Sequence, residues 1–310
     1  MGGLLIVHCW AVIFGAMALF HVIPNPLTFV LAVLLIGARQ LGLGVLMHDA
    51  AHNALFKTRV FNDWVSDVFC AWPILANTCE YRHYHLKHHA FTQQDQDPDT
   101  VLSEQFPVSP ASFRRKIFRD LTGQTAYRQR LMQLKMGFGS AEDPPKRRLL
   151  QAINTLGPYF CVNAALFLVC AALFHWSYYP LFWVLPLMTS YMAVLRLRNI
   201  AEHAFVPDKD DPLRNTRTTR VNLLERVFIA PYWVNYHIEH HLLMYVPCYR
   251  LPAIHHHLMG HGFGPKMELV NGFLEIIRSS SSGSDDDPDG KPARTQALVG
   301  SLSGGFSKNA

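Results

Sequence analysis

Two long stretches of the chain contain no charged residue. Asp, Glu, Lys and Arg make up only 16% of the 310 residues, whereas about a quarter is usual in a soluble domain. All four types are absent from residues 1–38 and 149–195. Each stretch is close to twice the roughly 20 residues that an apolar helix needs to cross a bilayer. Turn-forming residues interrupt each one, as "HVIPNP" at 21–26 and "HWSYYP" at 175–180. This distribution argues against a soluble globular protein.

The uncharged stretches predict four membrane-spanning helices in two hairpins. They should be helical because a bilayer core offers the backbone no hydrogen-bond partners. A signal peptide is a poor alternative for the first span, since no basic residue precedes its long apolar run. Arg39 and Gln40 fall within the second span, where charge is costly, so they either face the bundle interior or snorkel to the interface. The expected spans lie near residues 4–22, 28–47, 156–174 and 180–197.

Basic residues are missing from both short turns, and this absence sets the expected orientation. Twelve Lys and Arg residues lie between Arg82 and Arg148, and such residues favour the cytoplasmic side of a membrane. We therefore expect the N-terminus, residues 48–150 and everything after residue 198 to lie in the cytoplasm. The predicted fold is an all-α integral membrane protein with a cytosolic helical cap. Its membrane would be the inner or plasma membrane of a bacterium, or the endoplasmic reticulum of a eukaryote.

Other common signals are also missing. The six Cys show no C-x-x-C spacing, so they are typical of small apolar side chains in a reducing compartment. The basic residues form no compact stripe with base-stacking aromatics, which makes nucleic acid an unsuitable partner. Bulky apolar residues are scarce in residues 279–310. We expect that segment to be a disordered tail after one domain at residues 1–278.

Histidine, in contrast, is plentiful, with 17 residues. "HDAAH" follows the second span and "NIAEH" follows the fourth, while "HYHLKHH" at 83–89 and "NYHIEHH" at 235–241 share the pattern H-x-x-H-H. Positions i, i+3 and i+4 of a helix share one face, and all four sets fall on the same predicted side of the membrane. The candidate metal ligands are His48, His52, His85, His88, His89, His203, His237, His240 and His241.

Nine imidazoles are too many for one metal ion and fit two. A zinc ion takes four ligands, or three and a water, and Mg²⁺ or Ca²⁺ would need oxygen ligands. Imidazole suits zinc, copper, iron and nickel. Two adjacent redox metals favour O₂ chemistry, although the spacing leaves a dizinc site open. Carboxylates often accept the second N–H of a ligating imidazole; the candidates are Asp49, Glu202 and Glu239, with partial use of the "DQDPD" run at 95–99.

We expect the other histidines not to bind metal. His8, His21 and His175 lie in or beside the hairpins without partners, and His83 should point away from the face that its cluster shares. The run "IHHHLMGH" predicts an amphipathic helix that packs on the cap. It contains His255, His256, His257 and His261.

These motifs resemble those of the membrane fatty acid desaturase superfamily. The similarity covers most of residues 28–265 and includes "MHDAAHNALF", "YRHYHLKHHAFTQQDQDPD", "LRNIAEH" and "YWVNYHIEHHLLMYVPCYRLP". It implies four transmembrane helices and a cytosolic cap that holds two non-haem irons, with the nine histidines as ligands and O₂ as co-substrate. Asn199 matches the N-x-x-x-H of acyl-CoA desaturases, which implies that it reaches iron through a water.

Two features of the motifs differ between branches of this superfamily. The first histidine motif, or box, runs from His48 to His52 and has the form H-x-x-x-H. Acyl-CoA enzymes have the longer H-x-x-x-x-H, so this form favours acyl-lipid desaturases and their hydroxylase or ketolase relatives. The third box starts with His237, where front-end desaturases have Gln. No H-P-G-G is present, so we expect no fused cytochrome b5 domain. Electrons would then come from a separate donor of the ferredoxin, rubredoxin or cytochrome b5 type with its reductase.

The resemblance implies an O₂-dependent enzyme that introduces a double bond into a fatty acyl chain in the membrane. An apolar interior below the cap suits a long acyl chain. A carotenoid ketolase or another lipid hydroxylase is the nearest alternative, and a desaturase of an amino-acid-derived or sphingoid molecule is a further one. A membrane metal-binding or transport protein is the alternative from another class. Transporters bind their cargo near the bilayer midplane, whereas these clusters lie beyond the span ends.

Overall fold

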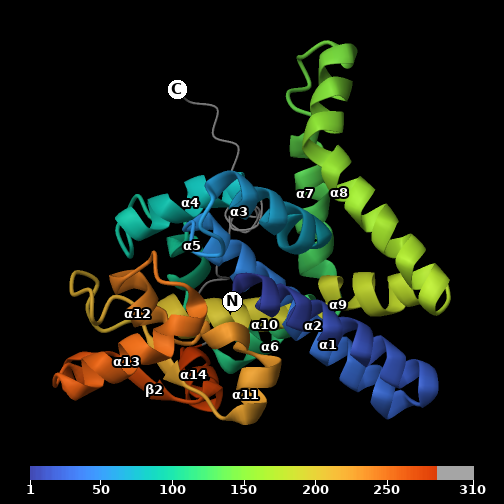
Figure 1. Cartoon of the computed structure of the whole chain (residues 1–310). Coiled ribbons are helices and arrows are strands. Elements are labelled where there is room, and N and C mark those ends of the chain that lie inside the picture. Colours follow the sequence, from blue (N-terminus) through green and yellow to red (C-terminus); the bar gives the residue numbers. More distant parts are fainter. Residues whose placement is uncertain (285–310) are drawn as a thin grey trace.

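The computed structural model describes residues 1–284 and consists mainly of helices (Figure 1). Four segments are long and apolar enough to cross a membrane, as the sequence predicted. They are α1 (Gly2–Val22), α2 (Pro26–Ala51), α8 (Pro145–Leu173) and the stretch Pro180–His203, which comprises η3 (Pro180–Val184), α9 (Leu185–Met188) and α10 (Ser190–His203).

The ends of these segments differ from the expected spans. α2 starts early because the Asn25 side chain accepts hydrogen bonds from the backbone N–H of Leu27 (2.9 Å) and Thr28 (3.0 Å) and caps the helix at Pro26. α8 also starts early, at Pro145, a residue type that the first turn of a helix tolerates. The fourth segment is interrupted at Thr189, whose φ of −126° and ψ of −87° are not helical.

α2 lies at the centre of the molecule (Figure 1). α1 and α10 both pack against it. Gly37 allows the close approach of α10, because a Cβ at that position would lie 2.2 Å from Ser190 Oγ. α8 contacts α7 (Gln124–Gly137) and η2 (Trp72–Ile74) and stands away from α1 and α2, on the right of Figure 1. From Ile36 onward, nearly every residue of α2 is buried.

Arg39 and Gln40 face the interior of the bundle, which was one of the two expected placements. Arg39 is buried, donates a hydrogen bond from Nη2 to the carbonyl of Val227 (2.7 Å) and lies over the Tyr232 ring, 5.5 Å from its centroid. Gln40 is also buried and donates to the carbonyl of Trp183 (2.8 Å). Interior partners therefore compensate two polar side chains that would be costly against lipid.

We refer to the elements outside the four membrane-length segments as the cap. Its first half contains α3 (Arg59–Ser66), η1 (Asp67–Ala71), η2, α4 (Thr78–Ala90), α5 (Thr100–Ser103), α6 (Pro110–Leu121) and α7. Its second half contains β1 (Thr218–Arg220), α11 (Leu223–Phe228), η4 (Pro231–Trp233), α12 (His237–Leu242), η5 (Cys248–Arg250), α13 (Leu251–Gly260), η6 (Gly264–Lys266), β2 (Leu269–Asn271) and α14 (Phe273–Ser280).

Two short strands qualify the expected all-α fold. β1 pairs in parallel with β2, with Thr218 opposite Leu269. Thr218, Thr219 and Val270 are β-branched residues, which fit an extended strand better than a helix. The pairing ties the segment that follows α10 to the segment that follows α13, on either side of α12. It therefore holds the helix with the last histidine cluster in place from both ends.

The first two residues of the expected tail, 279 and 280, are helical in the structure. α14 includes Ser279 and Ser280, and Ser280 is fully buried. Its carbonyl accepts a hydrogen bond from the backbone N–H of Val108 (2.9 Å), and the N–H of Gly283 donates to the carbonyl of Val108 (3.0 Å). Backbone pairing with residue 108 explains the difference, since composition does not reveal such contacts. The rest of the expected tail, residues 285–310, lies outside the described residues.

Candidate metal centre

Two membrane-length helices carry three of the candidate ligands into the cap. His48 lies in the last turn of α2, and His52 follows the end of that helix. Their rings lie 4.9 Å apart between centroids, as expected for an i, i+4 pair on one face. His203 is the last residue of α10. All three side chains are buried.

Two short helices carry the other six candidates. α4 contains His85, His88 and His89, and its start is fixed by Asn77, whose side chain accepts the N–H of Glu80 (2.9 Å). α12 has six residues and contains the remaining three, His237, His240 and His241.

The nine histidines meet in two compact groups. The ligand nitrogens within each group all lie within 4.8 Å of one another, a spacing that suits a single metal ion. The first group consists of His48, His52, His85, His89 and His240, and the second of His88, His203, His237 and His241. Each H-x-x-H-H cluster is divided between the two groups. The helices α4 and α12 therefore each contribute ligands to both groups.

Several buried ring nitrogens point at one another or have no partner. His89 Nε2 lies 3.0 Å from Nε2 of both His85 and His240, and His237 Nε2 lies 2.8 Å from His203 Nε2. A buried polar nitrogen without a partner costs free energy. A metal ion would satisfy such atoms, so the residues present fit one. Within the described residues, the unpartnered nitrogens include Nε2 of His48, His52, His88 and His241.

Burial keeps most of these imidazoles neutral. Loss of solvent, together with the neighbouring rings, lowers the pKa of His85 and His240 well below the usual range. Burial and the charge of Arg82 lower the pKa of His52 to about 4, and burial beside His52 lowers that of His89 to about 2. A neutral imidazole is the form that binds metal. The site is therefore ready for metal at neutral pH.

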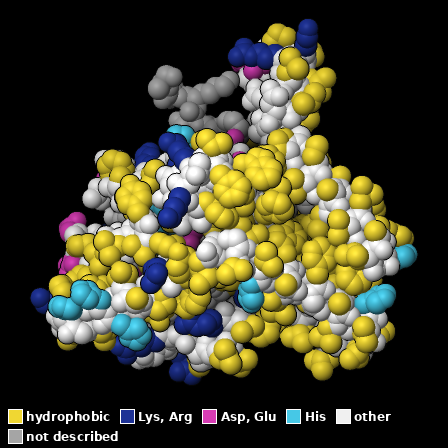
Figure 2. All heavy atoms as spheres, viewed as in Figure 1, with side chains coloured by type: hydrophobic (Ala, Val, Ile, Leu, Met, Phe, Trp, Pro, Cys, Tyr) yellow, Lys and Arg dark blue, Asp and Glu magenta, His cyan; other side chains and the backbone are white. Residues whose placement is uncertain are grey.

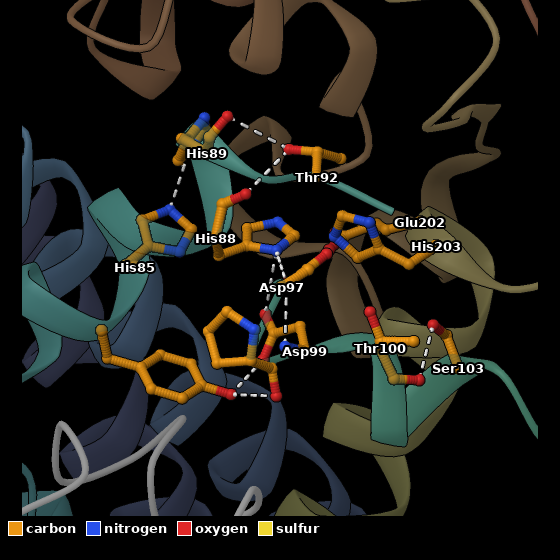
Figure 3. A network of polar contacts seen from close by, with 12 residues as sticks. His85, His88, His89, Thr92, Asp97, Asp99, Thr100, Ser103, Glu202 and His203 are labelled. Carbon is orange, nitrogen blue, oxygen red and sulfur yellow. Dashed lines mark hydrogen bonds and ion pairs between the residues drawn. The ribbon is translucent and has the colours of Figure 1, made fainter. Parts of the chain in front are cut away.

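His88 has a carboxylate partner that fixes its tautomer (Figure 3). Its Nδ1 lies 2.8 Å from Asp97 Oδ1 and 3.7 Å from Asp99 Oδ2, so Nδ1–H donates to Asp97 while Nε2 faces the second group. Burial lowers the pKa of His88, but Asp99 and Asp97 outweigh it and raise the pKa above its ordinary value. Asp97 is itself held by the backbone N–H of Gln93 (2.9 Å). The "DQDPD" run thus takes part in the site through two of its members.

Glu202 and Asp49 also lie close to candidate ligands, but neither carboxylate forms a hydrogen bond with one in the described part of the chain. Glu202 Oε2 is 3.5 Å from His237 Nδ1, while its Oε1 accepts a hydrogen bond from Arg198 (2.7 Å). Asp49 Oδ1 is 3.8 Å from His48 Nδ1, which is longer than a hydrogen bond.

Glu239 does not contact a candidate ligand in the described part of the chain, contrary to expectation. Its Oε2 accepts a hydrogen bond from Thr218 Oγ1 (2.6 Å), and its Oε1 lies 2.5 Å from His255 Nδ1. The reason is that Glu239 points from α12 toward β1 and α13 rather than toward α4. His255 remains outside both metal groups, but it has a structural contact that its sequence context did not reveal.

Asn199 lines a small cavity with His85, His203, His237 and Glu202. The cavity has a volume of about 40 Å³, and a single water needs roughly 10–15 Å³ measured in this way. Asn199 therefore lies where a water can sit between its amide and the candidate ligands.

The other histidines lie outside both groups. His8 Nδ1 is 2.9 Å from Tyr232 Oη, His21 Nδ1 is 3.2 Å from Tyr178 Oη, and His175 Nδ1 is 2.9 Å from Ser177 Oγ. The expected lack of partners for these three was wrong, because aromatic hydroxyls and a serine supply them. The side chains of His83, His256, His257 and His261 are also outside the two groups.

Comparison with known proteins identifies this architecture. Residues 24–266 match the family described as fatty acid desaturase. The chain belongs to the fatty acid desaturase family. This family is membrane-bound, in agreement with the four apolar segments of this desaturase. Membership also makes the protein an oxidoreductase.

Two curated relatives are desaturases. The chain is 29% identical over 266 residues to dihydrorhizobitoxine desaturase of Bradyrhizobium elkanii, covering 81% of this chain and 73% of that protein. It is 26% identical over 235 residues to the sn-1 oleoyl-lipid 12-desaturase of Synechocystis sp. (strain ATCC 27184 / PCC 6803 / Kazusa), covering 71% of this chain and 65% of that protein. The two relatives are named for different substrates.

Proposed function

We propose that this chain is an O₂-dependent desaturase of fatty acyl chains whose two histidine groups hold two iron ions. The supporting observation is the pair of groups of mostly buried imidazoles in a member of the desaturase family. The group of five, which includes His48 and His240, would bind one ion, and the group of four, which includes His88 and His203, the other. Asn199 would reach iron through a water in the adjacent cavity.

When bound, two reduced irons supply the means to activate O₂ for the removal of hydrogen from an unactivated CH₂ group. The protein contributes neutral imidazoles and a site from which bulk water is largely excluded. Asp97 orients His88 through its Nδ1. In the net reaction, neighbouring carbons lose two hydrogens and O₂ becomes two waters. A separate donor supplies two electrons, and solvent supplies two protons.

The topology that we propose has α1 with α2, and α8 with the Pro180–His203 segment, as two membrane hairpins. The cap then lies in the cytoplasm, because the basic residues between Arg82 and Arg148 lie on its side of the spans. A cytoplasmic cap is accessible to a soluble donor of the ferredoxin or rubredoxin type and to cytochrome b5.

A lipid-linked acyl chain is the substrate class that we favour. The short first box and the oleoyl-lipid relative both support it. A second candidate is a small molecule of another class, because the Bradyrhizobium relative is named for dihydrorhizobitoxine and shares 29% identity over 81% of this chain.

Expression in a host with a simple lipid profile tests this proposal. Product mass spectrometry should show new double bonds in acyl chains, and the purified protein should contain two irons per chain. His240→Ala should abolish the product and lower the iron content, whereas His256→Ala, at an exposed position of α13, should change neither. Full product formation by His240→Ala would refute the ligand assignment. Bound iron and reductant-dependent O₂ uptake without new lipid double bonds would favour the small-molecule substrate.

A further inference from the structure

The helix α3 buries two polar residues and exposes three large apolar ones, although its Val65 is buried and its Arg59 is exposed. Asn62 and Ser66 are fully buried, whereas Val60 and Trp64 are 80% and 54% exposed. Asn62 donates a hydrogen bond to the carbonyl of Ala50 (2.8 Å) and accepts one from the N–H of Phe56 (3.0 Å). A surface helix in water shows the opposite arrangement. The medium outside α3 is therefore expected to be apolar.

The two carboxylates of α3 and η1 are turned toward α4, whereas Arg59 at the start of α3 is exposed. Asp63 pairs with Arg82 of α4 (2.5 Å), and Asp67 accepts the backbone N–H of Thr78 (2.8 Å). These contacts leave the outer face of the segment to Val60, Phe61, Trp64 and Phe69, all of which are exposed. Amphipathic helices that lie in a membrane interface have such a face, with Trp and Phe toward the acyl chains.

Contacts with α1 show how deep this segment lies. α1 has 21 residues and, at 1.5 Å per residue, spans about 30 Å, which is the thickness of the hydrocarbon core. Phe56 lies beside Gly3, at the cap end of α1. Trp10 Nε1 donates to the carbonyl of Phe69 (2.9 Å), and Trp10 is about 12 Å along α1 from Gly2. The chain thus descends from the cap end of α1 at Phe56 to well inside the leaflet at Phe69.

A groove of about 760 Å³ lies between α1, η1 and α8. Its walls are apolar throughout and include Val7, Trp10 and Phe14 of α1, Phe69 of η1, and Ala165 and Val169 of α8. Figure 2 shows hydrophobic side chains gathered over this part of the molecule. Two of its walls are membrane-length helices, so the groove is continuous with the lipid-facing surface. None of the nine histidines lines it.

We propose that α3 and η1, unlike the other elements of the cap, are embedded in the bilayer leaflet that adjoins the cytoplasm, and that the groove they form with α1 and α8 holds an acyl chain of a membrane lipid. The inverted polarity of α3, the depth given by Trp10 and Phe69, and the apolar walls all require lipid rather than water. The volume is within the 300–1,000 Å³ usual for small-molecule sites.

Fluorescence quenching in nanodiscs tests the position of α3. The contribution of Trp64 is the difference between the wild-type protein and Trp64→Phe. Phospholipids brominated on the acyl chain should quench this contribution at least twofold, and aqueous iodide should leave it unchanged. Quenching by iodide and not by brominated lipid would place α3 in water and overturn the proposal.

Native mass spectrometry of the detergent-purified chain tests the groove. The wild-type protein should retain one phospholipid. Ala165→Trp should lose it by filling the groove, whereas Leu168→Trp, at an exposed position of α8 outside the groove, should keep it. Matching circular dichroism spectra and melting temperatures would show that both variants fold. Equal lipid retention by the two variants, or no lipid on the wild-type protein, would refute a lipid in the groove.

Discussion

His89 Nε2 lies 3.0 Å from His240 Nε2, although 151 positions separate the two residues in the sequence. The contact joins α4 to α12, and neither helix is long enough to be stable alone in water. Two imidazoles that face each other at this distance gain one hydrogen bond at most, since a neutral ring has one donor. A metal ion between them would satisfy both nitrogens, so this contact marks the position where we expect one.

Asp97 should set the metal affinity of the second group through His88. Asp97→Asn keeps the size of the side chain but removes the charge that orients the imidazole, and loss of such a partner typically costs about 10–100-fold in affinity or activity. Asp95→Asn is the matched control because Asp95 is exposed in the same run. Iron content after dialysis against a chelator measures the effect. Equal retention by the two variants would show that the Asp97 contact is unimportant for metal binding.

Thr218 of β1 should stabilise α12 through two hydrogen bonds to that helix. Its hydroxyl donates to Glu239 and accepts the N–H of Ile238 (3.1 Å). Thr218→Val leaves the Ile238 N–H and Glu239 Oε2 without this partner, at a cost of roughly 1–3 kcal/mol each, although Glu239 Oε1 keeps its contact with His255. We expect a lower melting temperature and weaker iron retention. Thr219→Val is the control, because Thr219 bonds Asn235 through its backbone; an equally large effect there would contradict this account.

Acid should destabilise the metal-free protein. The pKa of His52 is about 4 in the folded chain and about 6.5 when unfolded, so between these values the unfolded chain binds more protons. Stability therefore rises with pH in this window and is lost on acidification, by about 1.4 kcal/mol per such histidine at pH 5.5. His88, with its raised pKa, and Glu80, whose pKa burial raises to about 7, oppose the trend but are outnumbered by the histidines whose pKa is lowered. Melting temperatures of apoprotein in detergent from pH 7.5 to 5.5 measure the effect, and a rise on acidification would contradict it.

Cys79 can report which side of the membrane the cap faces. It is an exposed cysteine in α4. In intact bacterial cells, a membrane-impermeant maleimide should leave Cys79 unlabelled, and it should label this residue once the inner membrane is opened. Cys79→Ser provides the background. Labelling of Cys79 in intact cells would invert the proposed orientation.

The convergence of the nine histidines could be predicted from the sequence. Helical spacing puts positions i, i+3 and i+4 on one face, and the ends of the predicted spans put all four sets on one side of the membrane. The division of each cluster between two groups could not be predicted. It depends on how α4 and α12 are rotated relative to α2 and α10, which packing alone decides. Glu239 shows the same limit, since its partners Thr218 and His255 are set by a strand pair and a chain reversal.

The inverted polarity of α3 was also missed. Residues 48–150 carry many basic residues, and this average concealed a short segment whose outer face is apolar. Only the burial of Asn62 and Ser66 revealed which side of the helix faces the protein. Sequence periodicity can show that a helix has two different faces. Whether each face meets protein, water or lipid becomes clear only from the tertiary structure.

His88 and His89 are joined by one peptide bond and belong to different metal groups. The same holds for His240 and His241. A tilt or shift of α4 or α12 that relaxes one group must therefore move the other as well. Neither site can be empty without cost to its neighbour, so the two metals should load and leave together, and a chain carrying only one should be a minor species at every stage of a titration.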